Sequence, residues 1–191
     1  VSGVIQLKGN SLFDACCIAQ TYGYNKKRAT IPSTLIKKDV FIKNGYFIER
    51  RAGYDRVWPS ILKKNNITRG INYNSIMMYE GTNFATGIIS LIRKSITYSI
   101  PTIYLKMYYY PYLFLFFFVF FVGTLFINYH ISILFFLIYF FLRTFIIPFV
   151  KSNNLSIVRD YPLSILYLPI VGTVMDISRI IGLIIGLIKL K

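Results

Sequence analysis

The hydrophobic and polar positions divide the chain into two regions of different character. In residues 1–105, short apolar stretches alternate with charged and polar ones, which is typical of a water-facing domain of mixed structure. Residues 106–191 are dominated by Phe, Ile, Leu and Tyr, which is the composition of membrane helices. We therefore expect an α/β domain over 1–105, followed by an α-helical membrane region over 106–191.

Caps, apolar stripes and stop signals predict the helices of the first region. Ser33 or Thr34 is a suitable cap for a helix with an apolar stripe, and Gly45 is a suitable stop because glycine tolerates a left-handed backbone. Arg93 and Lys94 lie beside an isoleucine stripe, which indicates an amphipathic helix where the chain meets the membrane. The predicted helices cover residues 14–23, 34–44, 55–64 and part of 83–99. Between them, 25–30 is predicted as a basic loop and 70–81 as a strand or sheet edge.

The second region predicts a helical hairpin. Residues 111–127 and 131–150 are long and apolar enough to span a bilayer, and a short uncharged turn joins them. A tyrosine-rich flank at 104–112 is typical of an interfacial aromatic belt. Residues 161–188 are predicted either as a third span or as helices lying in the interface. Within them, Asp176 and Arg179 are spaced to pair on one helix face, and Gly182 and Gly186 would let another helix approach closely.

Basic residues predict the orientation of these segments. The turn at 128–130 carries no Lys or Arg, whereas the first region is strongly basic and the 151–160 loop holds Lys151 and Arg159. The positive-inside rule therefore places the polar domain and that loop in the cytoplasm and the His130 turn outside. Lys189 and Lys191 favour a cytoplasmic C-terminus, and hence an interfacial rather than a spanning course for 161–188.

Composition and charge narrow the choice of partners. The chain has 22 Lys and Arg against seven Asp and Glu, a net charge of +15, which suggests phosphates, anionic lipids or nucleic acid as partners. The same excess also arises from the composition of a low-GC genome without any binding role. Cys16 and Cys17 are adjacent and are the chain's two cysteines, so a disulfide framework and a cysteine zinc site are excluded. Because the chain begins with Val1 and carries no signal-peptide pattern, we expect the C-terminal part of a longer polypeptide; a processed N-terminus is the alternative.

One carboxylate is a candidate for chemistry. Asp55 lies among Arg50, Arg51 and Arg56, whose charges favour its ionised form, and a carboxylate can remove a proton from a hydroxyl held beside it. The alternative is that Asp55 caps the helix that follows it.

The stretch "IPSTLIKKDVFIKNGYFIERRAGYDRVWPSILKKNNI" at 31–67 resembles the acceptor-side half of family-two, GT-A-type inverting glycosyltransferases. The matching parts are a small-residue segment, a basic-basic-x-x-Phe pattern, a Gly-x-Phe turn and an acidic motif that opens a helix. The catalytic base of that motif falls on Asp55, while Tyr54 stands in place of its first acid. The parts that match are Ser33-Thr34, Lys37-Lys38 to Phe41, Gly45 to Phe47, Tyr54-Asp55 and Trp58.

The resemblance implies an α/β fold that is an incomplete GT-A-like half, followed by membrane helices. It implies a nucleotide-sugar donor, a lipid-linked or glycan acceptor, membrane lipids and no nucleic acid as partners. A divalent metal, Mg or Mn, would act in the full-length protein through an Asp-x-Asp motif that these residues lack, so we expect the fragment alone to be inactive. The processive members' Gln-x-x-Arg-Trp motif is also missing, which favours single transfer. The implied site residues are Asp55 as base and Thr34, Trp58, Arg93 and Lys94 for substrate.

Each of these residues also has a simpler interpretation. Trp58 is a candidate either to stack on a sugar or to fill the core. Arg93 and Lys94 would hold a phosphate or merely lie among lipid head groups. Arg143, within a span, is either functional or extends toward the cytoplasmic head groups. At the level of the whole protein, the alternative is a non-enzymatic membrane subunit of a transport or assembly complex with a basic cytoplasmic domain.

Overall fold

The structure is a computed structural model of mixed α/β type, with a small sheet and a majority of helices. The structure describes the backbone of residues 1–47, 54–78, 83–104, 110–152 and 155–189. It describes the side chains of the same residues, except those at 54–56, 104 and 110–114.

Three strands form the sheet, in the order β2-β1-β3: β1 (Ser2–Gln6), β2 (Arg28–Thr34) and β3 (Ile71–Met78). The central strand β1 is mostly buried and pairs antiparallel with β2 and parallel with β3. β3 is an exposed edge, which confirms the predicted strand. The predicted basic loop is wrong from Arg28 onward, because Arg28 and Ala29 pair with Ile5 and Val4 of β1.

Helix α1 (Leu12–Thr21) is largely buried and agrees with the predicted helix near Asp14. Ser11 caps it by accepting a hydrogen bond from the backbone N–H of Asp14. At its other end Gly23 adopts a φ of 90°, which glycine reaches without strain.

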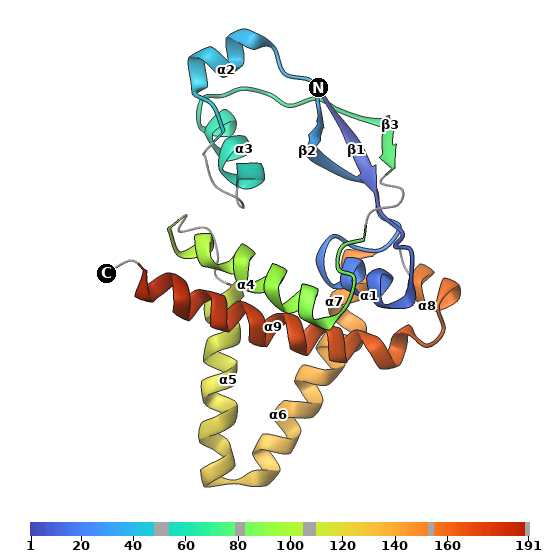
Figure 1. Cartoon of the computed structure of the whole chain (residues 1–191), viewed down its shortest axis with the longest axis vertical. Coiled ribbons are helices and arrows are strands. Elements are labelled where there is room, and N and C mark those ends of the chain that lie inside the picture. Colours follow the sequence, from blue (N-terminus) through green and yellow to red (C-terminus); the bar gives the residue numbers. More distant parts are fainter. Residues whose placement is uncertain (48–53, 79–82, 105–109, 153–154, 190–191) are drawn as a thin grey trace.

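Helices α2 (Lys38–Asn44) and α3 (Tyr54–Lys64) lie next to each other beside the sheet (Figure 1). The predicted cap at Ser33 or Thr34 is wrong, because β2 extends through Thr34 and Lys37 is the residue that precedes α2. The predicted stop is confirmed by Gly45, which has a φ of 79°. The predicted third helix is confirmed as α3.

Helices α4 (Ile88–Tyr104) and α9 (Ser164–Ile188) pack along each other. Glycines permit this close packing: a Cβ on Gly182 would lie 2.6 Å from the carbonyl oxygen of Ile96, and one on Gly186 would lie 2.8 Å from that of Ile100. The close approach predicted from the glycine spacing is confirmed, and the partner helix is α4.

The hairpin consists of α5 (Tyr110–Ile127) and a long second arm that begins with α6 (Tyr129–Phe141). The arm continues through the π-helix η1 (Leu142–Ile146) into α7 (Ile147–Lys151), and the short α8 (Ser156–Asp160) follows. Inside the hairpin, the hydroxyl of Ser132 donates to that of Thr124 at 2.9 Å. The side chains of the predicted tyrosine belt lie outside the described residues.

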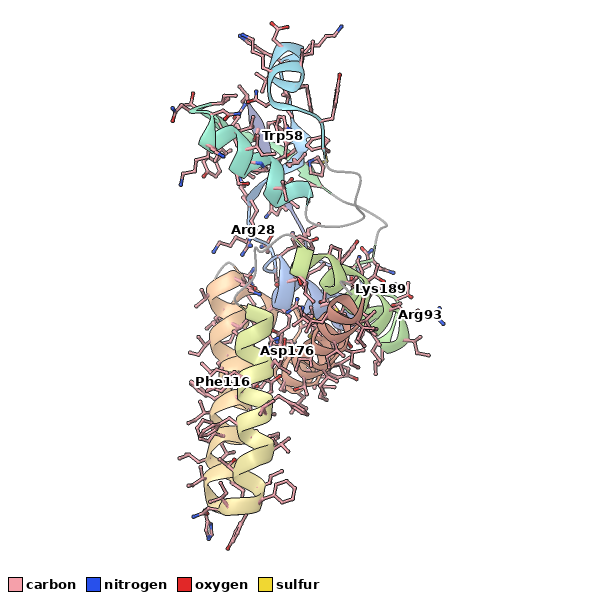
Figure 2. The ribbon with its side chains drawn as sticks, turned by 90° about the vertical axis from the view of Figure 1, so that its left-hand side faces the viewer. Arg28, Trp58, Arg93, Phe116, Asp176 and Lys189 are labelled. Carbon is pink, nitrogen blue, oxygen red and sulfur yellow. The ribbon has the colours of Figure 1, made fainter. Side chains whose placement is uncertain are left out.

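These elements stack along the long axis of the molecule. The sheet with α2 and α3 is at one end, α1, α4, α7, α8 and α9 are in the middle, and the α5–α6 hairpin projects at the other end (Figure 1). Within the described parts of the chain, two segments are long and apolar enough to cross a membrane, 129–151 and 164–188. However, α9 runs crosswise to the hairpin in Figure 1 and is seen nearly end-on in Figure 2, where the hairpin is again vertical, so α9 and the hairpin do not share a membrane-spanning direction.

Candidate functional site

Asp55 is the second residue of α3, so the backbone at this position opens a helix as the sequence predicts. Its side chain lies outside the described residues. Its role as a base therefore stays a prediction.

Trp58 lies in an aromatic core beside the sheet. Its side chain is 2% exposed, its ring centre is 4.8 Å from that of Phe41 and 5.2 Å from that of Phe47, and its indole N–H donates to the carbonyl oxygen of Gly45. Burial of both the ring and its polar atom is what a core tryptophan requires. The structure thus places Trp58 in the core position that the sequence left open as the alternative to sugar stacking.

Thr34 ends β2 and is tied to the protein's own groups. Its hydroxyl lies 2.7 Å from that of Ser2 and donates to the carbonyl oxygen of Thr30 at 2.7 Å. Arg69 approaches the same pair, with its Nε 2.5 Å from the Ser2 hydroxyl. These contacts hold the end of the sheet together, and they give Thr34 a structural use beside the substrate contact that the resemblance implies.

Arg93 is exposed on α4 and lines a shallow hollow of about 550 Å³. The hollow is formed with the first turn of α4, where Ser90 accepts a hydrogen bond from the backbone N–H of Gly87. Positive charge beside a helix N-terminus favours an anion. Arg93 is exposed beside this hollow, whereas Trp58, another of the predicted substrate residues, is buried.

Lys94 points back into the protein. Its ammonium donates to the carbonyl oxygen of Phe84 at 2.8 Å and lies 4.1 Å from the centre of the Phe84 ring. Burial lowers the pKa of Lys94, while the nearby charge of Asp14 opposes that shift. Asp14 itself accepts from the backbone N–H of Phe84, so both side chains hold the segment that leads into α4. In Figure 2, Trp58 and Arg93 lie in different parts of the molecule, and no described contact joins them.

A buried polar cluster, which the sequence did not predict as a unit, joins α1, the second hairpin arm and α9. We call it the polar clasp and define it by Gln20, Tyr139, Arg143 and Asp176. The guanidinium of Arg143 holds the carboxylate of Asp176 through two nitrogens, and the Tyr139 hydroxyl donates to the same carboxylate at 3.0 Å. Arg143 is 1% exposed, so the predicted extension toward the head groups is wrong: an internal partner binds it instead.

The predicted pair of Asp176 and Arg179 exists, with 3.5 Å between the closest nitrogen and oxygen atoms, but it is secondary. The reason is geometric. Arg143 is supplied by another helix and reaches both carboxylate oxygens, whereas Arg179 approaches one of them from the same helix, three positions along.

Gln20 completes the clasp by donating a hydrogen bond to the backbone carbonyl of Arg143, which receives none from the π-helical pattern of η1. In η1 the N–H of Ile147 bonds to the carbonyl of Leu142, five residues back, and the next N–H in that pattern would come from Pro148, which has none. The carbonyl of Arg143 accepts from the side-chain amide of Gln20 at 2.7 Å instead. The amide oxygen of Gln20 in turn accepts from Arg143 at 3.0 Å.

Gly172 provides the room for this arrangement. A Cβ at that position would come within 3.0 Å of the Gln20 amide nitrogen and 3.2 Å of an Arg143 side-chain carbon. Single-sequence reasoning missed the clasp because its members come from three separate parts of the chain: Arg143 lies 33 residues from Asp176 and 123 residues from Gln20. The available signals were two charges in apolar segments, Arg143 and Asp176, together with a proline placed to disturb the helix.

The other reactive side chains that the structure describes do not gather into a site. Cys16 and Cys17 are fully buried, and burial raises the pKa of each thiol to about 12. His130 lies at the hairpin turn beside the ring of Tyr129. Within the described ranges, no three His, Cys, Asp or Glu side chains are grouped to hold a metal ion.

Comparisons with known proteins leave the family open: no protein-family model, curated protein or solved structure matches this chain.

Proposed function

We propose that the chain is the acceptor-side, membrane-anchored part of an inverting glycosyltransferase, which transfers a sugar from a nucleotide-sugar donor to a lipid-linked or glycan acceptor. One observation carries the proposal. A helix opened by Tyr54-Asp55 precedes the apolar hairpin, in the order that the sequence resemblance implies.

The small sheet supports the idea of an incomplete GT-A-like domain. β3 is exposed along its whole length, and it pairs on one side with β1. Unpaired edge strands are ready sites for pairing with further strands. In this proposal a nucleotide-binding segment upstream of Val1 adds to the sheet and carries the Asp-x-Asp motif for Mg or Mn.

The chemistry assigned to this chain is a direct displacement. The Asp55 carboxylate accepts the proton of an acceptor hydroxyl while that oxygen forms a bond to the anomeric carbon. The bond from that carbon to the nucleotide diphosphate breaks, and the diphosphate leaves with the electron pair. Arg93, open on its hollow at the start of α4, supplies positive charge for a phosphate of the donor or acceptor.

The membrane placement follows from shape and polarity together. The hairpin exposes large apolar side chains such as Phe116, Phe126 and Leu137, which lipid would cover. α9 exposes a second apolar face while lying crosswise to the hairpin, as expected of a helix in the head-group plane. We infer that the hairpin spans the bilayer, α4 and α9 lie on its cytoplasmic surface, and the sheet faces the cytoplasm. The face of α9 consists of Leu166, Ile170, Ile177, Ile181, Ile184 and Ile188.

The test is Asp55→Asn in the complete polypeptide, with sugar transfer measured in membranes. Loss of a general base lowers a rate by about 10²–10⁴-fold, and we expect a loss in that range. Asp39→Asn, an exposed carboxylate of α2, is the matched control and should keep full activity. Equal activity of wild type and Asp55→Asn at equal protein levels would remove Asp55 as the base.

The alternative is a non-enzymatic membrane subunit with a basic cytoplasmic domain. Three large apolar side chains of the part around α2, Leu35, Ile42 and Tyr46, are at least 60% exposed, which favours a protein partner there. The coding sequence upstream of Val1 discriminates between the two: a strand-rich segment with Asp-x-Asp supports the transferase, and a start codon at or just before Val1 supports the subunit.

A further inference from the structure

The cytoplasmic end of the second hairpin arm is covered by basic side chains from a distant loop. The ammonium of Lys26 donates to the carbonyl oxygen of Val150, and the guanidinium of Arg28 donates to that of Lys151, each at 3.2 Å. Gly23 lets the loop approach, since a Cβ there would lie 1.8 Å from the Lys151 carbonyl oxygen. Cations at a helix C-terminus satisfy its open carbonyls and complement its dipole. The contacts therefore fix positive charge where the apolar helix ends.

Further basic side chains lie near the end of the second hairpin arm, in addition to the two that bond to its carbonyls. We call the group the cationic rim and define it by Lys8, Lys26, Lys27, Arg28 and Arg159. Lys8 and Lys27 are exposed, and the Arg159 side chain is 78% exposed. Among the described residues, Asp160 is the carboxylate that lies with them. It already accepts from the Tyr24 hydroxyl at 2.9 Å and pairs with Arg159 at 3.3 Å.

Lys26 and Arg28 of the rim contact the end of the second hairpin arm, next to its apolar surface. Figure 2 shows Arg28 beside the upper end of the hairpin, with the phenylalanine-rich helices extending away below it. Positive charge next to the end of a membrane-spanning segment lies at the depth of lipid phosphates, and anionic lipids attract such clusters. Nucleic acid would contact the same charges but would leave the adjoining apolar surface uncovered.

We propose that the cationic rim binds the anionic head groups of bilayer lipids, so that the chain selects membranes rich in lipids of the phosphatidylglycerol type. This inference rests on the membrane placement in the proposed function. It adds a lipid preference that does not depend on catalysis.

The experiment uses the full chain in a neutral detergent, titrated with phosphatidylglycerol or phosphatidylcholine while the thermal midpoint is followed by circular dichroism. A ligand that binds the folded state raises the midpoint, and at a given concentration a tighter ligand raises it more. We expect phosphatidylglycerol to raise the midpoint, phosphatidylcholine to leave it unchanged, and 0.5 M salt to weaken the effect.

Two triple variants, each of which removes three positive charges, separate the contribution of the rim from that of the net charge of the chain. Lys8→Gln with Lys27→Gln and Arg159→Gln should require roughly 10–100-fold more phosphatidylglycerol for the same shift. The control changes exposed lysines far from the hairpin and should match wild type; it combines Lys37→Gln, Lys38→Gln and Lys63→Gln.

Several results would overturn the inference. These are equal shifts with the two lipids, equal losses in the two triple variants, or an equivalent shift with inorganic phosphate or an oligonucleotide. Extraction of the chain from membranes by alkaline carbonate is measured separately. If the chain resists extraction but shows no lipid preference, only the proposal that the rim binds anionic lipids is refuted. If the chain is extracted, the membrane placement on which both proposals rest is refuted.

Discussion

Asp176→Asn tests whether the polar clasp holds α9 to the hairpin. The substitution keeps the shape of the side chain and an acceptor for the Tyr139 hydroxyl, but it removes the charge that Arg143 binds. The side chains of Arg143 and Asp176 are 2% and 4% exposed, so the guanidinium that is left behind has no access to water. Removing one partner of a buried pair costs about 3–5 kcal/mol, because the other charge stays buried without compensation.

The measurement is the free energy of unfolding in a neutral detergent, obtained by denaturant titration with helical circular dichroism. We expect a loss of about 3–5 kcal/mol for Asp176→Asn, which is more than two orders of magnitude in the folding equilibrium. Arg159→Gln is the matched control, since its pair with Asp160 is exposed and should contribute ~1 kcal/mol or less. The double variant Arg143→Met with Asp176→Leu should recover more than half of the loss, because an apolar pair leaves no charge to bury.

A loss below about 1 kcal/mol for Asp176→Asn would refute this reasoning. It would mean that the clasp either admits water or contributes little to holding the three segments together. A double variant as unstable as the single one would instead show that packing volume, and not the stranded charge, accounts for the loss.

Two further predictions follow from close packing and burial. Gly182→Leu should destabilise the protein by about 1–3 kcal/mol in the same titration, because the new Cβ would lie 2.6 Å from the backbone of α4. The control Gly123→Leu should be neutral, because a Cβ at that position has no atom within 4 Å. Equal losses of stability in the two variants would contradict the α4–α9 contact. Cys16 and Cys17 should resist iodoacetamide in the folded chain and react after unfolding, as measured by mass spectrometry at pH 8 and pH 9.5. Burial raises each thiol pKa from 9.0 to about 12, so between these pH values the folded state keeps protons that the unfolded state releases. The free energy of unfolding should therefore fall as the pH rises from 9.0 toward about 12. Rapid labelling of the folded chain would contradict the burial of the two thiols.

Local signals in the sequence sufficed for elements that depend on neighbouring residues. The Gly45 stop, the helix around Asp14, the edge strand at 71–78 and the apolar hairpin are specified by caps, periodicity and unbroken apolar runs. The prediction failed at Thr34, where a capping residue is also a good strand residue and pairing with β1 decided the outcome.

What the sequence by itself determined is the division into a basic polar region and an apolar one, because composition sets which solvent each region tolerates. Only the tertiary structure decided how Arg143, Asp176 and Gln20 meet, and that α9 lies crosswise instead of alongside the hairpin. The physical reason is that a charge in an apolar segment must find a partner, but the identity of that partner depends on which helices come together in space. Periodicity describes one helix face at a time and carries no information about the face that will cover it.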